Sequence, residues 1–130
     1  MKKYTHIILK VILSLLIITP ILGALHIFPA PTAEMYSNPA AFAFISAMMN
    51  SYIVYGIAIT CLLTLIALWS GRVLLAMLLL LPVTMNIIGF HATLDGGLLT
   101  GGAMMGNVLF LINIYLLVTE RAKLAQLFTR

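Results

Sequence analysis

The chain has 130 residues, of which 63% are hydrophobic and only 8% are charged, with a formal net charge of +4. An ordinary soluble domain has about a quarter of its residues charged, so this composition excludes one and indicates a membrane protein. It also excludes a disordered chain and, because Cys61 is the one cysteine, a disulfide scaffold. The lysines and arginines lie at the edges of apolar runs rather than on one basic face, so no nucleic-acid partner is expected.

The charged residues are spaced in a way that suits repeated membrane crossings. One crossing needs about 20 apolar residues, so four crossings occupy about 80 and leave room only for short loops. The sequence therefore predicts an all-α fold, an integral membrane four-helix bundle built as one domain over residues 1–130. The crossings are expected at about residues 7–25, 51–69, 73–93 and 98–118.

The first apolar run follows Lys2 and Lys3, and Lys10 can extend its ammonium back to the lipid headgroups. A secretory signal peptide has a similar basic start, and the small residues 30–33 resemble a cleavage region. The run is long enough to cross a bilayer and three more apolar runs follow. A retained helix is therefore the favoured interpretation.

An external loop with a short extra helix is predicted between the first two crossings. Two prolines in residues 26–38, followed directly by Pro39, disfavour a continuous helix. The uncharged run 35–71 is too long for one crossing and too short for two crossings with a turn. A short interfacial or re-entrant helix over about 39–50 resolves this, with Asn38 as its N-cap and Pro39 in its first turn.

The third and fourth crossings carry proline and glycine at informative places. Pro82 lies near the middle of the third crossing, where it predicts a kink and frees a carbonyl near Leu78 for a partner inside the bundle. The fourth crossing opens with glycines four residues apart, a spacing that lets helix backbones approach closely. The glycines expected to pack in this way are Gly97, Gly101, Gly102 and Gly106.

The distribution of charge predicts the orientation in the membrane. Four crossings place both termini on the same side, and all the cations then fall on that side, whereas Glu34 and Asp95 fall on the other. By the positive-inside rule the termini are cytoplasmic, with residues 119–130 as a basic amphipathic tail along the inner surface. The cations are Lys2, Lys3, Lys10, Arg72, Arg121, Lys123 and Arg130.

Four titratable residues are expected at the outer end of the bundle: His26, His91, Glu34 and Asp95. His91 and Asp95 are four residues apart, which places them on one face if the helix continues between them. Histidine changes its charge near neutral pH, so His91 is the candidate catalytic residue of a proton-accepting or quinone-headgroup site, with His26 and Asp95 as possible ligand-binding residues. Ordinary hydrated polar residues at an interface remain the alternative.

Asparagine side chains near the bilayer midplane form the second candidate site. Asn86 and Asn107 are expected at similar depth on consecutive crossings, where they either line a small-molecule pocket or make interhelical hydrogen bonds. Asn113 lies closer to the cytoplasmic end, where the structural interpretation is stronger.

No metal site is expected. The pairs Met48-Met49 and Met104-Met105 provide soft thioethers that suit Cu(I), but adjacent residues on a helix point about 100° apart, and methionine commonly fills irregular apolar packing. Neither a nucleotide-binding loop, a nucleophile elbow nor a His/Cys ligand spacing occurs, which weakens every self-contained enzyme model.

The third crossing also carries a family resemblance. The run from Leu81 to His91 contains Pro82, Asn86, Phe90 and His91 in the pattern P-x-x-x-N-x-x-x-F-H, and Leu94-Asp95 follows. It resembles the DoxX-like family of small bacterial membrane proteins, and the layout of crossings, proline-bearing loop and basic tail agrees over nearly the whole chain. This chain departs from the family in its second crossing, where many relatives have an acidic residue and this one offers only Tyr52, Tyr55, Thr60 and Cys61.

The resemblance implies a four-helix protein of the bacterial inner membrane, with relatives named as subunits of thiosulfate:quinone or terminal quinol oxidase systems. We therefore expect an accessory or assembly subunit without self-contained catalysis, with the bilayer and a membrane protein or a second copy of the chain as partners. The alternative is a redox-linked subunit that binds quinone as a cofactor, in which His91 handles protons and Asn86 and Asn107 hold the headgroup. A small-solute transporter is less favoured, because the chain has no internal repeat.

Overall fold

The computed structural model describes residues 2–129, and within that range every regular element is a helix. The predicted all-α fold class is therefore confirmed. Met1 and Arg130, the last residue of the predicted basic tail, lie outside the described residues. The helices are α1 (Lys2–Ala24), the 3-10 helix η1 (Ala33–Met35), α2 (Pro39–Met49), α3 (Ile53–Trp69), α4 (Val73–Thr93), α5 (Ala103–Thr119) and α6 (Arg121–Gln126).

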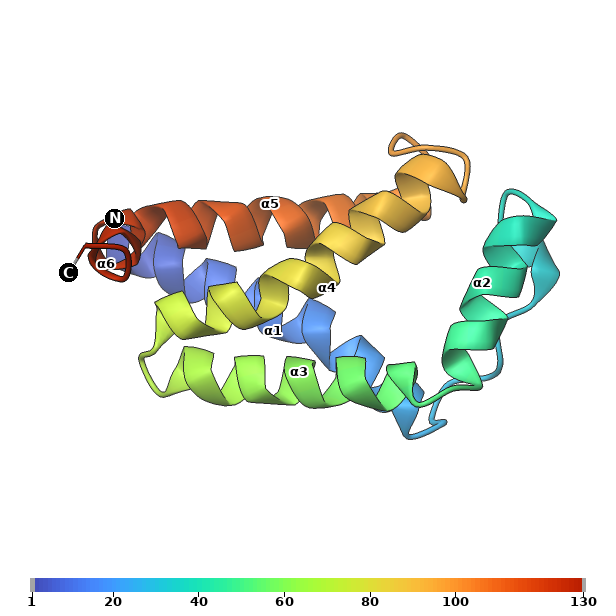
Figure 1. The fold of residues 1–130 in the computed structure, drawn as a ribbon, viewed down its shortest axis with the longest axis horizontal. Helices are drawn as coiled ribbons and strands as arrows, with labels where there is room; N and C mark the ends of the chain where they lie inside the picture. The colour runs from blue at the N-terminus through green and yellow to red at the C-terminus, as the bar shows by residue number, and fades with distance from the viewer. Residues whose placement is uncertain (1, 130) are drawn as a thin grey trace.

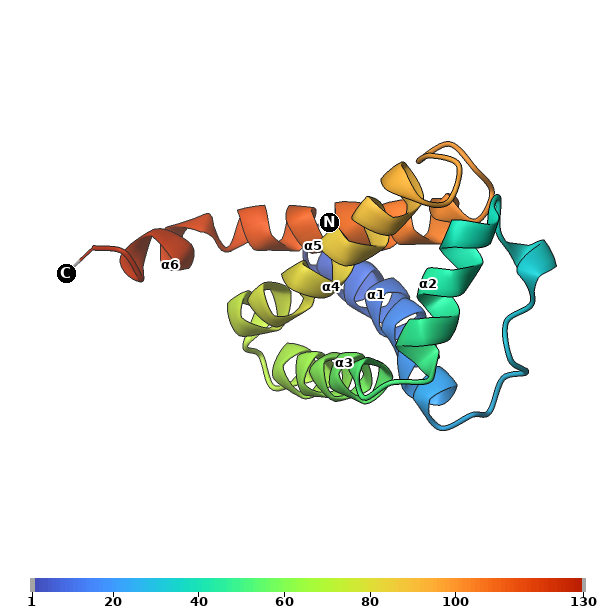
Figure 2. The ribbon, with the colours of Figure 1, turned by 45° about the vertical axis from the view of Figure 1, so that its right-hand side comes forward.

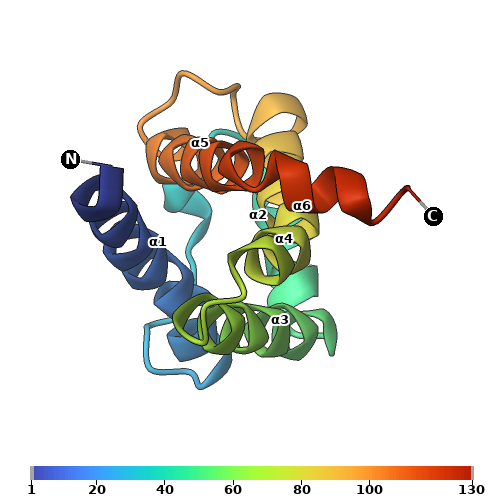
Figure 3. The same cartoon turned by 90° about the vertical axis from the view of Figure 1, so that its left-hand side faces the viewer.

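Four of the helices in the described range pack around a common core, in the cyclic order α1, α3, α4, α5 (Figure 3). Each helix contributes large apolar side chains that are completely or almost completely buried. Burial of this apolar surface, with few polar atoms, holds the helices together by close packing. The core includes Leu13 and Ile17 of α1, Cys61 and Leu68 of α3, Met77 and Leu80 of α4, and Leu109 and Leu116 of α5.

The outer faces of these helices are apolar as well, which is the reverse of a soluble bundle. Exposed side chains include Ile8, Leu15, Ile59, Ile66 and Leu111, each more than half exposed. Among residues 2–129, α1 and α4 are long and apolar enough to cross a membrane, and α2 with α3 forms a third candidate if the bent pair counts as one span. These helices indicate a membrane protein; α5 is apolar but shorter.

The short helix α2 lies across one end of the bundle (Figures 1 and 2). It meets α3 at an angle of 74°, so the long uncharged run is divided into two helices, as expected. Its start also follows the prediction: the Asn38 side-chain oxygen accepts a hydrogen bond from the Ala41 N–H at 3.0 Å, and Pro39 occupies the first helical position. The extra helix is thus a separate element beside the bundle.

The opposite end of the molecule carries the described cations apart from Lys10, which lies about two turns inside α1. The start of α1, the turn between α3 and α4, and α6 all lie at that end, away from α2 and the α4–α5 loop (Figure 1). Gly71 forms the turn with a φ of 79°, and the Trp69 indole N–H donates to the Ser14 hydroxyl at 3.0 Å, which ties the end of α3 to α1. The charge separation expected from the sequence is therefore present in the fold.

A buried polar network joins α4 to α5 near Pro82. The completely buried Asn113 amide donates to the Met77 carbonyl at 3.1 Å, and the Thr84 hydroxyl lies 2.9 Å from the Asn113 side-chain oxygen. The structural interpretation of Asn113 is confirmed. The carbonyl that Asn113 binds belongs to Met77, one residue before Leu78, near which Pro82 was expected to free a carbonyl. Beyond the proline, the second half of α4 turns away from α3 and runs beside α5 (Figure 1).

The start of the last long helix differs from the prediction. Helix α5 begins at Ala103 rather than near residue 98, so Gly97, Gly101 and Gly102 lie in the preceding loop. A Cβ atom added at Gly97 or Gly101 would meet nothing within 4 Å, so these two residues do not serve close helix packing. At Gly106 the added atom would lie 2.5 Å from Cγ2 of Ile87, so the packing prediction holds there.

Candidate functional site: the Asp95 latch and the α2–α4 groove

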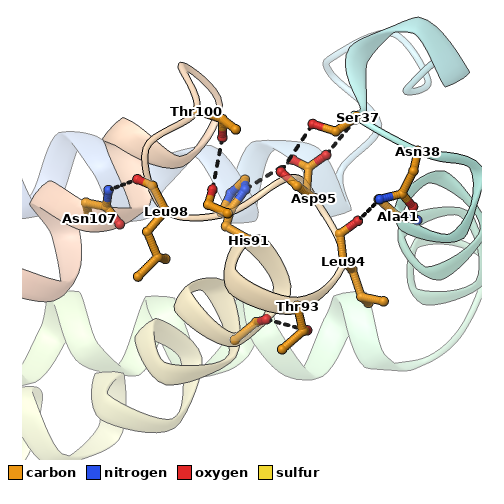
Figure 4. A network of polar contacts seen from close by, with 12 residues as sticks. Ser37, Asn38, Ala41, His91, Thr93, Leu94, Asp95, Leu98, Thr100 and Asn107 are labelled. Atoms are coloured by element: carbon orange, nitrogen blue, oxygen red, sulfur yellow. Dashed lines mark hydrogen bonds and ion pairs between the residues drawn. The ribbon is translucent and has the colours of Figure 1, made fainter.

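Asp95 connects the end of α4 to the segment that leads into α2 (Figure 4). It is only 4% exposed, and its Oδ1 accepts a hydrogen bond from the Ser37 N–H at 2.8 Å. The Ser37 hydroxyl donates to the Asp95 carbonyl at 3.2 Å, and the Asn38 amide donates to the Leu94 carbonyl. We call the group formed by Ser37, Asn38, His91, Leu94 and Asp95 the Asp95 latch.

The backbone after α4 makes the latch possible. Gly96 and Gly97 have φ values of 80° and 101°, a region that glycine occupies without steric cost. A Cβ atom on Gly96 would lie 2.7 Å from the Ser37 hydroxyl oxygen, so this glycine also provides space for the incoming loop. The Gly97 N–H donates to the His91 carbonyl at 2.8 Å and closes the end of the helix.

His91 lies beside the Asp95 carboxylate (Figure 4). Its Nδ1 is 3.1 Å from Asp95 Oδ2, and 13% of the His91 side chain is exposed. The Asp95 oxygen is not in the direction in which a ring N–H at Nδ1 would point. Within residues 2–129, Nδ1 therefore lies close to the carboxylate but makes no hydrogen bond. The ring also lies 3.8 Å from where a Cβ on Gly102 or Gly106 would be. The pairing expected from the four-residue spacing is present.

Tyr36 packs beside the latch, with its ring edge-on to Phe90 at a centroid distance of 6.2 Å. Burial, and secondarily the negative charge of Asp95, raise the pKa of the Tyr36 phenol above its ordinary value. The folded chain therefore favours the protonated phenol.

This shift predicts a sensitivity to alkali. A raised pKa in the folded state gives stability that is fully present below the unfolded pKa of about 10 and is lost as pH rises through the folded pKa. We expect the free energy of unfolding to fall less steeply in this range for Tyr36→Phe than for the wild type, measured by detergent-based denaturation followed by circular dichroism. Tyr52→Phe, at an exposed ring, should keep the wild-type slope. Parallel curves for Tyr36→Phe and the wild type would contradict the assignment.

A groove of about 430 Å³ opens between α2 and α4, next to the latch, with which it shares Leu94. Phe44 of α2 stacks against Phe90 of α4 at a centroid distance of 5.7 Å. Most of the groove wall is apolar, and Asn86 contributes a side-chain amide to it. The amide nitrogen donates to the Pro82 carbonyl at 3.0 Å, and the amide oxygen accepts no hydrogen bond within the described part of the chain. The lining residues are Phe44, Pro82, Met85, Asn86, Gly89, Phe90, Thr93 and Leu94.

The residues proposed from the sequence occupy separate places. His91 and Asp95 meet in the latch, while Asn86 lines the groove. The Asn107 amide donates to the Leu98 carbonyl at 2.7 Å in the loop before α5, rather than facing Asn86. His26 is exposed in the turn after α1, with a φ of 55°, and the ion pair and ring contact of His91 in the described part of the chain are with Asp95 and Phe90 rather than with His26. One polar pocket containing all of these residues is therefore not formed.

Two parts of the site were not predicted. Ser37 was missed because its partner Asp95 is 58 residues away in the chain, and the one local signal was the position of Ser37 just before the N-cap of α2. Phe44 was missed because an aromatic residue in an apolar helix has no distinguishing spacing. Both residues come from the segment that α2 places against α4.

Across residues 2–129 no three His, Cys, Asp or Glu side chains are grouped so that they could hold a metal ion. Comparisons with models of protein families, with curated proteins and with solved structures find no match to this chain.

Proposed function

We propose that this chain is an integral protein of the bacterial inner membrane that crosses the bilayer four times, through α1, α3, α4 and α5. Helices α3 and α5 have 17 residues each. At 1.5 Å per residue they extend about 26 Å, close to the 30 Å hydrocarbon thickness. The cationic end faces the cytoplasm with both termini, and α2 with the latch faces the outside.

Within this arrangement, the chain acts as an accessory subunit that holds a lipophilic molecule in the α2–α4 groove and has no catalysis of its own. The free oxygen of the Asn86 amide, set in an apolar wall beside the stacked Phe44 and Phe90 rings, carries this proposal. Pockets for small molecules typically combine an apolar lining with a few polar groups that orient the ligand. The ligand expected here has a flat apolar body and one hydrogen-bond donor.

The latch supports the accessory role because its ionisable groups face one another rather than the groove. Asp95 is occupied by the Ser37 N–H and by His91, and neither Asp95 nor His91 lines the groove. Their contribution is to hold the Phe44-bearing helix beside α4. The motif that resembles the DoxX-like family is then divided between two places. Its groove residues are Pro82, Asn86 and Phe90, and its latch residue is His91.

A redox-linked quinone subunit is the second candidate. The stacked aromatic pair favours it, because a planar ring packs well against phenylalanine. It requires a proton-handling group at the ligand, and the nearest candidate, His91, lies in the latch. An oxidoreductase role therefore needs a partner protein to provide that group.

The proposal is tested by purifying the protein from native membranes in a mild detergent and identifying extracted small molecules and co-purifying proteins by mass spectrometry. We expect one class of lipophilic compound to be retained by the wild type. Asn86→Leu should reduce its retention about fivefold, the effect of losing one hydrogen bond of about 1 kcal/mol.

Thr60→Val is the matched control, because the Thr60 hydroxyl also bonds to a carbonyl of its own helix, at 2.9 Å from Gly56, but lies outside the groove. Equal retention by Asn86→Leu and the wild type would overturn the groove assignment. A retained quinone that exchanges electrons with a co-purifying protein, with both retention and electron transfer lowered in Asn86→Leu, would favour the redox subunit.

A further inference from the structure

A second groove lies on the outer face of the α3–α4 hairpin, at the cationic end of the molecule. It has a volume of about 500 Å³, and its walls are leucine, isoleucine and alanine side chains. Leu63, Ile66 and Leu75 are each 45–56% exposed, so the groove is open along its side. The lining residues are Leu63, Ile66, Ala67, Ser70, Arg72, Leu75 and Leu79.

Arg72 makes one end of this groove strongly cationic. Its guanidinium is exposed and has no acidic partner among residues 2–129, whereas Lys123 at the same end of the molecule pairs with Glu120 at 2.6 Å. Ser70 places a hydroxyl in the same wall, and no acidic side chain lines the groove. The groove therefore combines an unpaired cation and a hydroxyl with an apolar channel.

We infer that this groove binds a glycerophospholipid with an anionic headgroup. The phosphate is held by the Arg72 guanidinium and the Ser70 hydroxyl, and an acyl chain lies along the apolar walls. Arginine suits phosphate because its planar donors match the phosphate oxygens. The helical stretch from Leu63 to Ser70 is about 10 Å long, enough to cover the upper part of an acyl chain.

The absence of an acidic residue from the groove lining selects between lipid classes. A zwitterionic headgroup brings its own ammonium close to Arg72, with no carboxylate there to receive it. An anionic headgroup meets the cation without this repulsion. The inference rests on the proposed function in one respect: the membrane orientation places this groove in the cytoplasmic leaflet, where anionic lipids are attracted to basic groups.

The test is native mass spectrometry of the full-length protein in detergent, titrated with phosphatidylglycerol or with phosphatidylcholine of the same acyl chains. We expect phosphatidylglycerol to bind the wild type about fivefold more tightly, the size expected for one cation near an anionic headgroup. Arg72→Gln should abolish this preference, and Leu75→Phe, which narrows the groove, should weaken the binding of both lipids.

Arg121→Gln is the matched control, because Arg121 is an exposed cation at the same end of the molecule but lies outside the groove. A preference that is absent from the wild type, or that Arg121→Gln lowers as much as Arg72→Gln, would overturn the inference. Carbonate extraction of membranes separates this failure from that of the proposed function. Protein released by carbonate would contradict membrane insertion, whereas inserted protein without a lipid preference would contradict only the lipid site.

Discussion

Replacing Asp95 with alanine is expected to lower the free energy of unfolding by about 2 kcal/mol, the cost of leaving a buried hydrogen-bond donor without its carboxylate acceptor. The substitution leaves the Ser37 N–H without its acceptor and removes the neighbour of His91 Nδ1. It also weakens the attachment of the start of α2 to the end of α4, which then depends on the Ser37 and Asn38 side-chain bonds to backbone carbonyls, so the Phe44 wall of the α2–α4 groove should become less well held. Unfolding by sodium dodecyl sulfate in mixed micelles, followed by far-ultraviolet circular dichroism, measures the change.

Glu34→Ala is the control for this prediction, because Glu34 is an exposed carboxylate in the same external region. Its substitution should change stability by less than about 0.5 kcal/mol. Asp95→Asn keeps an oxygen acceptor for Ser37 and should retain part of the stability. Similar losses for Asp95→Ala and Glu34→Ala would show that the latch does not hold α2.

Elements bounded by local signals were predictable from the sequence. Helix α4 occupies the expected residues 73–93 because a glycine turn precedes it and a pair of glycines follows it. The start of α2 was equally predictable from the sequence. The asparagine side chain accepts a hydrogen bond from a free N–H of the first turn, and the proline that follows it has no N–H to satisfy. In both cases the deciding interactions lie within a few residues of the boundary.

The start of α5 shows where a hydropathy pattern fails. The apolar run continues through Leu98 and Leu99, so a crossing that begins near residue 98 fits the composition. Four glycines in the segment 96–102 oppose a helix, each by about 1 kcal/mol relative to alanine, and Leu99 is 97% exposed. Glycines that looked like a packing motif instead form a loop, and only Gly106 contacts the neighbouring helix closely.

The candidate site was predictable only where its members share a helix. The spacing of His91 and Asp95 predicted their proximity, because residues four apart lie on one helical face. The pairing of Ser37 with Asp95, and of Phe44 with Phe90, depends on how α2 crosses the end of the bundle. Spacing along a chain predicts depth in a membrane but not the distance between helices at that depth.

Substitution of Gly106 by alanine is expected to destabilise the contact between α4 and α5 by about 1–3 kcal/mol, the usual cost of overpacking. The new Cβ would lie 2.5 Å from Cγ2 of Ile87, well inside van der Waals contact, so the two helices must separate or Ile87 must leave its rotamer. The same denaturation in mixed micelles measures this loss.

Gly56→Ala provides the opposite expectation, because a Cβ at Gly56 meets nothing within 4 Å on α3. There alanine should stabilise the helix by up to about 1 kcal/mol. In an Ile87→Ala background the obstructing Cγ2 is gone, so Gly106→Ala should become neutral or stabilising. A loss at Gly106 that persists in that background would mean that the contact with Ile87 is not its cause.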